Sequence, residues 1–445
     1  MPVRNALKAV GAALAVIALC APLIFWPVDE AQPTTLDISA VTATVPPTVV
    51  VPTTVSPSET TTTTTTEVSA EPAPTTTTTT LPISITVAAV GDVLPHMPII
   101  NSVRDRQTGS YDFGPVFAPI APYLAGADYT VANLETCLAG PQAGYSGYPR
   151  LNSPTELAFA LRSAGVDLAA TANNHSLDMG WEGLTGTLDR LDSAGLAHVG
   201  TYRSMQERRT PFIADIRGIR VAFLDYTAGL NGLTPPQEHE GYAVNTLDAD
   251  AVIEDAMTAR TWGADVVIAI IHYGDEYERE PSQEQVDISR EILSRGGVDV
   301  IIGSHPHVVQ PIAHVVEYAS WKVASKYIAY SLGNFVSAQR WRYSDSGLVA
   351  YVHIEKRGLR AFVTGISYLP VYVQRATEEQ VRYRVLPVLP GLEPQTDVPL
   401  SAAEKQRMAA VWEELRDLLY RPDENIAPLN PADLGWVSWP VARLP

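Results

Sequence analysis

Two histidines one residue apart, His305 and His307, follow the short apolar run Ile301-Ile302-Gly303. An apolar run of this kind is typical of a buried strand. The carboxyl ends of strands in an open α/β sheet border the crevice where ligands bind, and neutral imidazole is the commonest metal ligand in proteins. The pair therefore indicates a metal site, although two nearby histidines alone are more often structural or simply exposed.

Other apolar runs in the chain also end in polar side chains. The residues that follow them are Asp92, Glu135, Asn174 with His175, and His272. Taken singly, each could be an ordinary turn, cap or surface residue. Their shared position at strand ends favours one common site, and the mixture of carboxylate, amide oxygen and imidazole suits two divalent ions such as Mn²⁺, Fe or Zn²⁺. A bridging carboxylate would be needed between the two ions.

Three further assignments concern acid–base chemistry. Asp178 lies three residues after His175 and could orient that imidazole through its second ring nitrogen. Glu276 follows His272 closely and could be a ligand, an acid–base group, a substrate-positioning carboxylate or a solvated charge. We therefore predict His175, Asp178 and Glu276 as the catalytic residues.

The elements that must position these residues can be recognised by their periodicity. Apolar runs separated by helical stripes predict an α/β fold, with strands near residues 83–90, 129–132, 166–172, 221–225, 266–271 and 301–303. After Gly347 the pattern changes to short alternating strands, which we expect to form a second sheet layer, at 348–354, 361–369 and 382–388. A helix is expected near 402–420.

The N-terminus has the character of a membrane segment. Arg4 and Lys8 precede an apolar run from Ala9 to Trp26, which is long enough to approach a bilayer span. A cleaved signal peptide and an uncleaved signal-anchor both fit, and the lack of a small-residue cleavage site favours the anchor. We predict a single-pass protein of the cell membrane, with residues 1–8 in the cytoplasm, 9–26 crossing the bilayer and the globular part outside the cell.

Residues 27–82 are rich in Thr and Pro and are predicted to be a disordered linker, because such a composition buries too little apolar surface to offset the entropy of ordering. An O-glycosylated stalk and a bare tether are equally compatible with it.

Cys20 and Cys137 are the only cysteines, so no disulfide framework is expected. The formal net charge of −18 gives no basic footprint for nucleic acid.

At these residues a resemblance to a known family appears. The ordered motifs resemble the signature of the CapA family, the poly-γ-glutamate capsule biosynthesis proteins, which are similar to calcineurin-like metallophosphoesterases. The motifs are Gly91-Asp92, Asn133-Leu134-Glu135, Ala172-Asn173-Asn174-His175-Ser176-Leu177-Asp178, His272-Tyr273-Gly274-Asp275-Glu276-Tyr277, Gly303-Ser304-His305-Pro306-His307 and Tyr330-Ser331-Leu332-Gly333-Asn334-Phe335.

The resemblance implies a four-layer α/β/β/α sandwich with a dinuclear centre. It places Asp92 and His307 on one ion, Asn174, His272 and His305 on the other, and Glu135 at the bridge. His175 matches the histidine that acts as general acid or stabilises an oxyanion. The sequence departs from the superfamily in two ways: the histidine of the usual D-x-H opening is absent after Asp92, and Glu stands where a bridging Asp is usual. His96 could substitute for the absent histidine or be a simple loop residue.

The resemblance implies a role in the synthesis of poly-γ-glutamate capsule or another cell-surface polymer. Two functions remain open: a metal-dependent hydrolase, and a component that binds or guides an anionic polymer without turnover. The implied partners are an anionic polymer such as poly-γ-glutamate, capsule synthase subunits and the membrane through the N-terminal segment. The CapA-like domain is expected at 83–338, with 339–445 completing the sandwich.

Overall fold

The computed structural model describes residues 81–319, 322–377, 381–391, 394, 399–430 and 434. The predicted membrane segment at 9–26, and the predicted linker as far as residue 80, lie outside these residues. Within the described part of the chain, no helix has both the length and the apolar character needed to cross a bilayer.

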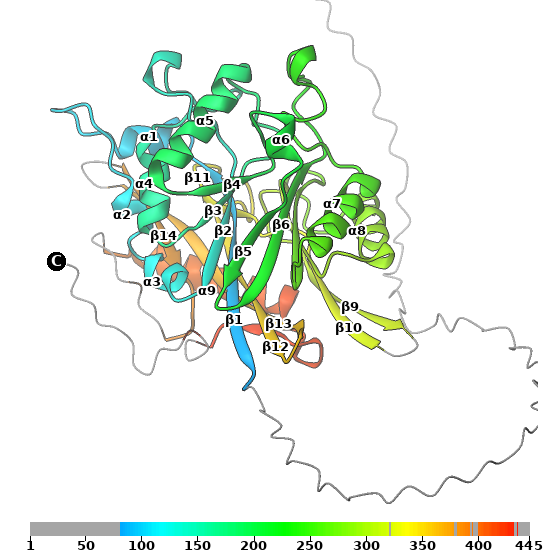
Figure 1. Ribbon diagram of the computed structural model, residues 1–445. Helices are drawn as coiled ribbons and strands as arrows, with labels where there is room; N and C mark the ends of the chain where they lie inside the picture. Colours follow the sequence, from blue (N-terminus) through cyan, green and yellow to red (C-terminus); the bar gives the residue numbers. More distant parts are fainter. Residues whose placement is uncertain are drawn as a thin grey trace, which may run out of the picture. The chain divides into compact units, whose positions relative to one another are not determined.

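The first sheet contains the strand on which the opening carboxylate of the site lies. Its central path runs in the order β14 (Val381–Pro387), β13 (Arg360–Thr377), β12 (Ser346–Arg357), β1 (Ile83–Leu94), β2 (Tyr129–Leu134), β3 (Leu168–Ala170) and β4 (Ala197–Val199). The short strands β11 (Asn334–Ser337) and β15 (Ile426–Pro428) pair with β1 and β13. The run from β1 to β4 is parallel, so these strands end at the same edge (Figure 1).

The second sheet carries the histidines. Its order is β5 (Phe212–Ile216), β6 (Ile219–Thr227), β7 (Val266–His272), β8 (Val300–Ser304), β10 (Lys322–Ala329) and β9 (Ile312–Ala319). The strands β6, β7 and β8 are parallel to one another. Both faces of β7 and β8 are buried, which explains why these strands are almost continuously apolar rather than alternating.

The layers follow from three separate apolar cores. Alternate residues of β1 such as Val87 pack against Ile268 and other residues of the second sheet. The residues between them, such as Ala88, pack on the other face against the helices α1 (Met97–Ser102), α2 (Gly114–Phe117), α3 (Ala121–Ala125), α4 (Glu156–Ser163) and α5 (Gly180–Ala194). The outer face of the second sheet is covered by α7 (Ala249–Thr261) and α8 (Gln283–Arg295). The expected four-layer α/β/β/α sandwich is therefore confirmed (Figure 1).

The expected role of the C-terminal strands as a second sheet layer is wrong. The strands β12, β13 and β14 join the first sheet, because β12 pairs antiparallel with β1 from Ile83 to Val90. The predicted C-terminal helix, α9 (Ala402–Leu419), packs into the same apolar core as the inner faces of the two sheets, through Met408, Val411 and Leu415.

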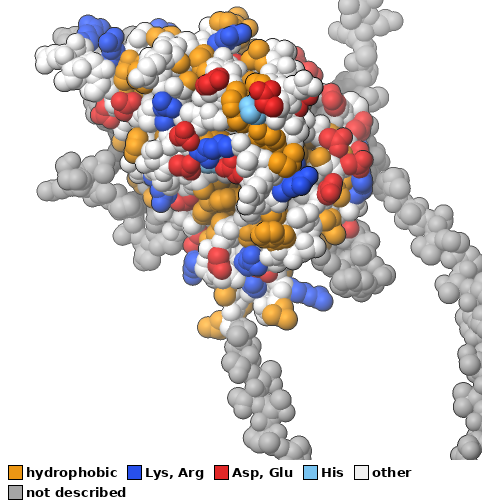
Figure 2. All heavy atoms as spheres, turned by 45° about the horizontal axis from the view of Figure 1, so that its top comes forward, with side chains coloured by type: hydrophobic (Ala, Val, Ile, Leu, Met, Phe, Trp, Pro, Cys, Tyr) orange, Lys and Arg blue, Asp and Glu red, His pale blue; other side chains and the backbone are white. Residues whose placement is uncertain are grey.

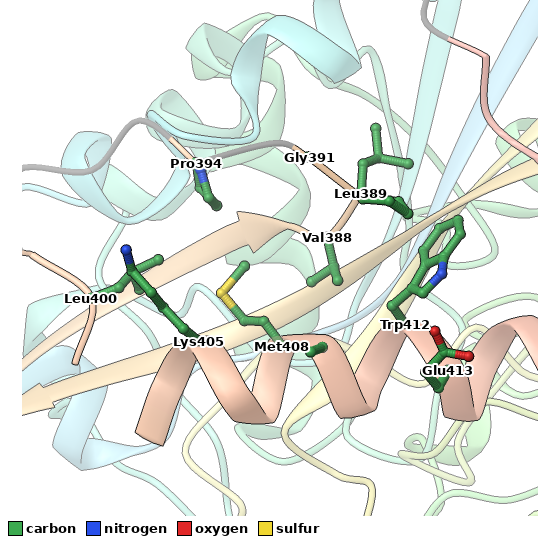
Figure 3. A pocket seen from close by; sticks show the side chains of 11 residues that line it. Val388, Leu389, Gly391, Pro394, Leu400, Lys405, Met408, Trp412 and Glu413 are labelled. Carbon is green, nitrogen blue, oxygen red and sulfur yellow. The ribbon is translucent and has the colours of Figure 1, made fainter. Parts of the chain in front are cut away.

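A cavity of about 420 Å³ lies where α9 meets the end of β14 (Figure 3). Its wall is mainly apolar and includes Val388, Leu389, Met408 and Trp412, with Lys405 and Glu413 on the helix. Among the described residues that line this cavity there is no histidine, and none belongs to a candidate metal-ligand group. This cavity is therefore distinct from the predicted metal site.

Four short elements complete the described chain, namely the helix α6 (Met205–Arg208) and the 3₁₀ turns η1 (Pro141–Ala143), η2 (Gln237–His239) and η3 (Pro422–Glu424).

Candidate metal centre

Asp92 lies near the carboxyl end of β1, where the backbone just before β11 approaches closely. The amide of Asp92 donates to the carbonyl of Gly333 at 2.9 Å, and a Cβ added at Gly91 would lie 1.9 Å from that same oxygen. Glycine is thus required at position 91. The buried Asp92 carboxylate accepts from Asn133 Nδ2 at 2.8 Å and lies 2.9 Å from His307 Nδ1.

Glu135 directly follows β2 and is completely buried. Neither of its carboxylate oxygens has a hydrogen-bond partner in the described part of the chain. Imidazole nitrogens surround it at a distance, with His272 Nε2 at 3.6 Å, His307 Nδ1 at 3.9 Å and His175 Nε2 at 4.0 Å. Burial, and after it the charge of Asp92, raises the pKa of Glu135 well above its ordinary value.

His272, the last residue of β7, and the two histidines that follow β8 converge on this carboxylate. His305 and His307 both adopt positive φ, at 100° and 58°, a conformation that is uncommon outside glycine and concentrates at functional sites. The rings of His272 and His305 lie 4.7 Å apart. Burial lowers the pKa of both, that of His272 strongly. Both imidazoles are therefore favoured in the neutral form that binds metals.

The ligand atoms form two overlapping groups. In one, Glu135 lies with His272 and His305; in the other, Glu135 lies with Asp92 and His307. Within each group these atoms all lie within 4.8 Å of one another. A buried carboxylate without a partner is costly unless a cation compensates it, so the residues fit a divalent cation, with Glu135 common to both groups.

Asn174 lies in the loop after β3, and its Oδ1 is 2.9 Å from His272 Nε2. It can therefore add an amide oxygen to the group that contains His272. Asp225 of β6 holds this loop in place, because its buried Oδ2 accepts from the amide of Ala172 at 2.7 Å. Burial raises the pKa of Asp225 well above its ordinary value.

His175 is held by Asp178, as the spacing predicts. His175 Nδ1 donates to Asp178 Oδ2 at 2.6 Å, and the same oxygen accepts from the amide of Leu151 at 2.6 Å. The other ring nitrogen, Nε2, faces Glu135. His175 is thus oriented toward the carboxylate group without belonging to either set of candidate ligands.

A cavity of about 400 Å³ opens beside these groups, a size typical of small-ligand sites. Asn174, His175, Asp178 and His307 line it, and so does Glu276, which belongs to neither candidate group in the described chain. His96 also lines it. Burial, with a smaller effect of His307, lowers the pKa of His96 to about 4, and its Nδ1 lies 3.1 Å from the carbonyl of Leu94.

The structure thus brings Asp92, Glu135, Asn174 and the three histidines 272, 305 and 307 together, with His175 and Asp178 beside them and Glu276 on the cavity wall. Their roles as ligands and catalysts stay predictions. Two supporting residues are not among the predicted site residues: Asn133, which donates to Asp92, and Asp225. The only sequence signal for them was a polar side chain within or just after an apolar run.

Comparison with known proteins places this geometry in a family. The family model described as "Bacterial capsule synthesis protein PGA_cap" matches residues 86–339, more than half of the chain and all of the site. The chain belongs to the bacterial PGA_cap capsule synthesis family.

Similar proteins include the capsule biosynthesis protein CapA of Bacillus anthracis, which is 29% identical over 307 residues, covering 67% of this chain and 69% of that protein. The PGA biosynthesis protein CapA of Bacillus subtilis is 28% identical over 303 residues, covering 67% and 74%. The PGA_cap family and these relatives confirm the resemblance that the motifs carry.

Solved structures that are similar include the calcineurin-like phosphoesterase YfkN of Bacillus subtilis, with 15% identity and a TM-score of 0.38, covering 76% of this chain and all of that one. The NAD nucleotidase of Haemophilus influenzae gives 13% identity and a TM-score of 0.43, covering 76% and 64%. Because both TM-scores lie below 0.5, the layers are assigned from the packing of the chain itself.

Proposed function

We propose that this PGA_cap protein is a metal-dependent hydrolase that acts in the synthesis of a poly-γ-glutamate capsule or a related cell-surface polymer. The observation that carries the proposal is Glu135, a fully buried carboxylate without a hydrogen-bond partner that is common to two candidate ligand groups. Two divalent ions, of Mn, Fe or Zn, would satisfy both groups.

The candidate residues have distinct tasks in this proposal. Asp92 and His307 would hold one ion, Asn174, His272 and His305 the other, and Glu135 both. The chemistry that such ions supply is Lewis-acid polarisation of a phosphoryl or acyl oxygen. Asp178 fixes the His175 ring so that Nε2 faces the cavity, where it can give a proton to a leaving group or stabilise an oxyanion.

The cellular setting is part of the proposal. We place residues 9–26 in the cell membrane and the domain from residue 83 outside the cell, on the strength of the apolar run and its positive flank. The names of the relatives in Bacillus, a capsule biosynthesis protein and a PGA biosynthesis protein, support poly-γ-glutamate as the polymer and capsule synthase subunits as partners.

The variant His175→Ala tests the proposed catalysis. The purified protein is assayed for metal content, for hydrolysis of bis(p-nitrophenyl) phosphate and for cleavage of poly-γ-glutamate. We expect unchanged metal content, because His175 is in neither ligand group, and a fall in turnover of about 100-fold or more. Full activity of this variant would refute the role of His175. A metal-loaded wild type that binds poly-γ-glutamate without turning over either substrate would favour the non-catalytic polymer-binding function.

A further inference from the structure

The wall of the active-site cavity is dominated by acidic and neutral groups. Asp178 and Glu276 line it, beside the candidate metal ligands. Among the described residues that line the cavity, Arg150 is the only arginine or lysine. On the face shown in Figure 2, acidic and basic side chains are interspersed, and the basic ones form no broad patch. The whole chain has a net charge of −18. An anionic substrate must therefore be recognised by a local group.

Arg150 keeps its donors available for such a group. Its side chain is exposed at the cavity and forms no ion pair or hydrogen bond with the described part of the chain. Other arginines differ: Arg203 binds Asp192 at 2.6 Å, and Arg407 binds Asp345 at 2.9 Å. A guanidinium presents a planar fork of N–H donors that matches the two oxygens of a carboxylate or phosphate.

The backbone on either side of Arg150 fixes its position relative to His175. The carbonyl of Arg150 accepts from Ser146 Oγ at 2.6 Å. The next amide, that of Leu151, donates to Asp178 Oδ2, the oxygen that also holds His175 Nδ1. One carboxylate oxygen thus joins the backbone beside Arg150 to the imidazole of His175, so the fold sets the position of the Arg150 backbone relative to the ring, and both residues line one cavity.

We infer that Arg150 is the substrate-anion receptor of this site. It binds an oxyanion, either a carboxylate or a phosphate, that the substrate carries close to the bond facing His175. The inference rests on the proposed function and narrows its substrate class to compounds with a negative charge beside the reacting bond. A γ-linked glutamate chain has this chemistry, because each α-carboxylate lies near a γ-amide bond.

The test uses the full-length protein in the presence of a chelator, so that binding is read without turnover. The probes are a fluorescein-labelled γ-linked glutamate oligomer, its α-methyl ester and a labelled glycerol-phosphate oligomer. The variants are Arg150→Ala and Arg150→Lys. Arg357→Ala makes the same charge change at the last residue of β12, at the opposite end of β1 from Asp92, and serves as the control.

For Arg150→Ala we expect a loss of affinity of about tenfold or more for a charged oligomer, which corresponds to one charge-assisted hydrogen-bonded pair. We expect no change for the methyl ester, partial retention in Arg150→Lys, and values within twofold of wild type for Arg357→Ala. The charged probe that shows this dependence on Arg150 identifies the anion as carboxylate or phosphate.

Three outcomes would overturn the inference: equal binding of charged oligomers by Arg150→Ala and wild type, an equal loss for the methyl ester, and a wild type that binds neither charged oligomer. None of these would remove metal-dependent hydrolysis of bis(p-nitrophenyl) phosphate. The inference and the proposed function can therefore fail separately.

Discussion

At the scale of single residues, the site depends on charges that the protein leaves uncompensated. Glu135 has no hydrogen-bond partner among the described residues, and its carboxylate is close to that of Asp92. Such an arrangement destabilises a protein without a cation and favours binding of one. The nearby Asn133 supplies no hydrogen bond to Glu135, because its side-chain amide donates to Asp92.

The substitution Glu135→Gln should separate the destabilisation of the metal-free protein from the stabilisation that a bound cation gives. In chelator we expect the variant to be as stable as the wild type or more stable, because the free-energy cost of burying a carboxylate without a partner has been removed. With Mn²⁺ at a hundredfold excess over the dissociation constant, the wild type should gain about 2.7 kcal/mol in free energy of unfolding and the variant little. Thermal denaturation with and without metal measures both.

The matched control is Glu276→Gln, which removes a carboxylate from the cavity wall outside both candidate ligand groups. It should keep the metal-dependent stabilisation. An equal gain for Glu135→Gln and wild type would contradict a ligand role for Glu135.

At the scale of elements, the site depends on close backbone approaches at strand ends. Gly91→Ala would drive a Cβ into the Gly333 carbonyl, which accepts from the Asp92 amide. We expect a loss of at least about 2 kcal/mol in stability, from overpacking, together with weaker metal binding. Gly229→Ala is the control, because a Cβ there meets no atom within 4 Å. Denaturant unfolding compares the two, and similar midpoints would contradict the account.

Asp225, on β6 of the second sheet, positions the loop after β3 of the first sheet. Asp225→Ala should cost about 2 kcal/mol or more, because the buried amide of Ala172 loses its acceptor. Metal affinity should also fall, since Asn174 lies in the same loop. Asp225→Asn should be nearly neutral, because it keeps an oxygen acceptor and burial already favours the uncharged acid. Calorimetric titration with Mn²⁺ and thermal denaturation test this, and a destabilised Asp225→Asn equal to Asp225→Ala would show that charge is essential.

At the scale of the whole molecule, the C-terminal strands are integral to the first sheet. A chain that ends at Ala338 would lack β12, which pairs with β1 from Ile83 to Val90. We expect such a chain to show no cooperative thermal transition, whereas a chain that ends at Asn430 keeps one, as circular dichroism would show. A cooperative transition in the shorter chain would mean that the fold is complete before β12.

The apolar runs that end in polar residues predicted the α/β class and the grouping of the site, because such runs reveal both a strand and its carboxyl end, whereas the four layers were implied only by the resemblance to the CapA family. The sequence could not predict which partner a strand takes: the alternation in β12 indicates a strand but not its pairing with β1. It also could not predict Asn133 or Asp225 as supporting residues. Their contacts, Asp92 and Ala172, are 41 and 53 positions away, and no local pattern records such contacts.

Elemental analysis of the full-length protein tests whether Glu135 would be a ligand shared by two divalent cations. We predict about two equivalents of Mn, Fe or Zn per chain in the wild type, and a large loss in Glu135→Gln with the fold retained. A wild type that takes up no divalent metal, or a Glu135→Gln variant that keeps the full amount, would contradict the account.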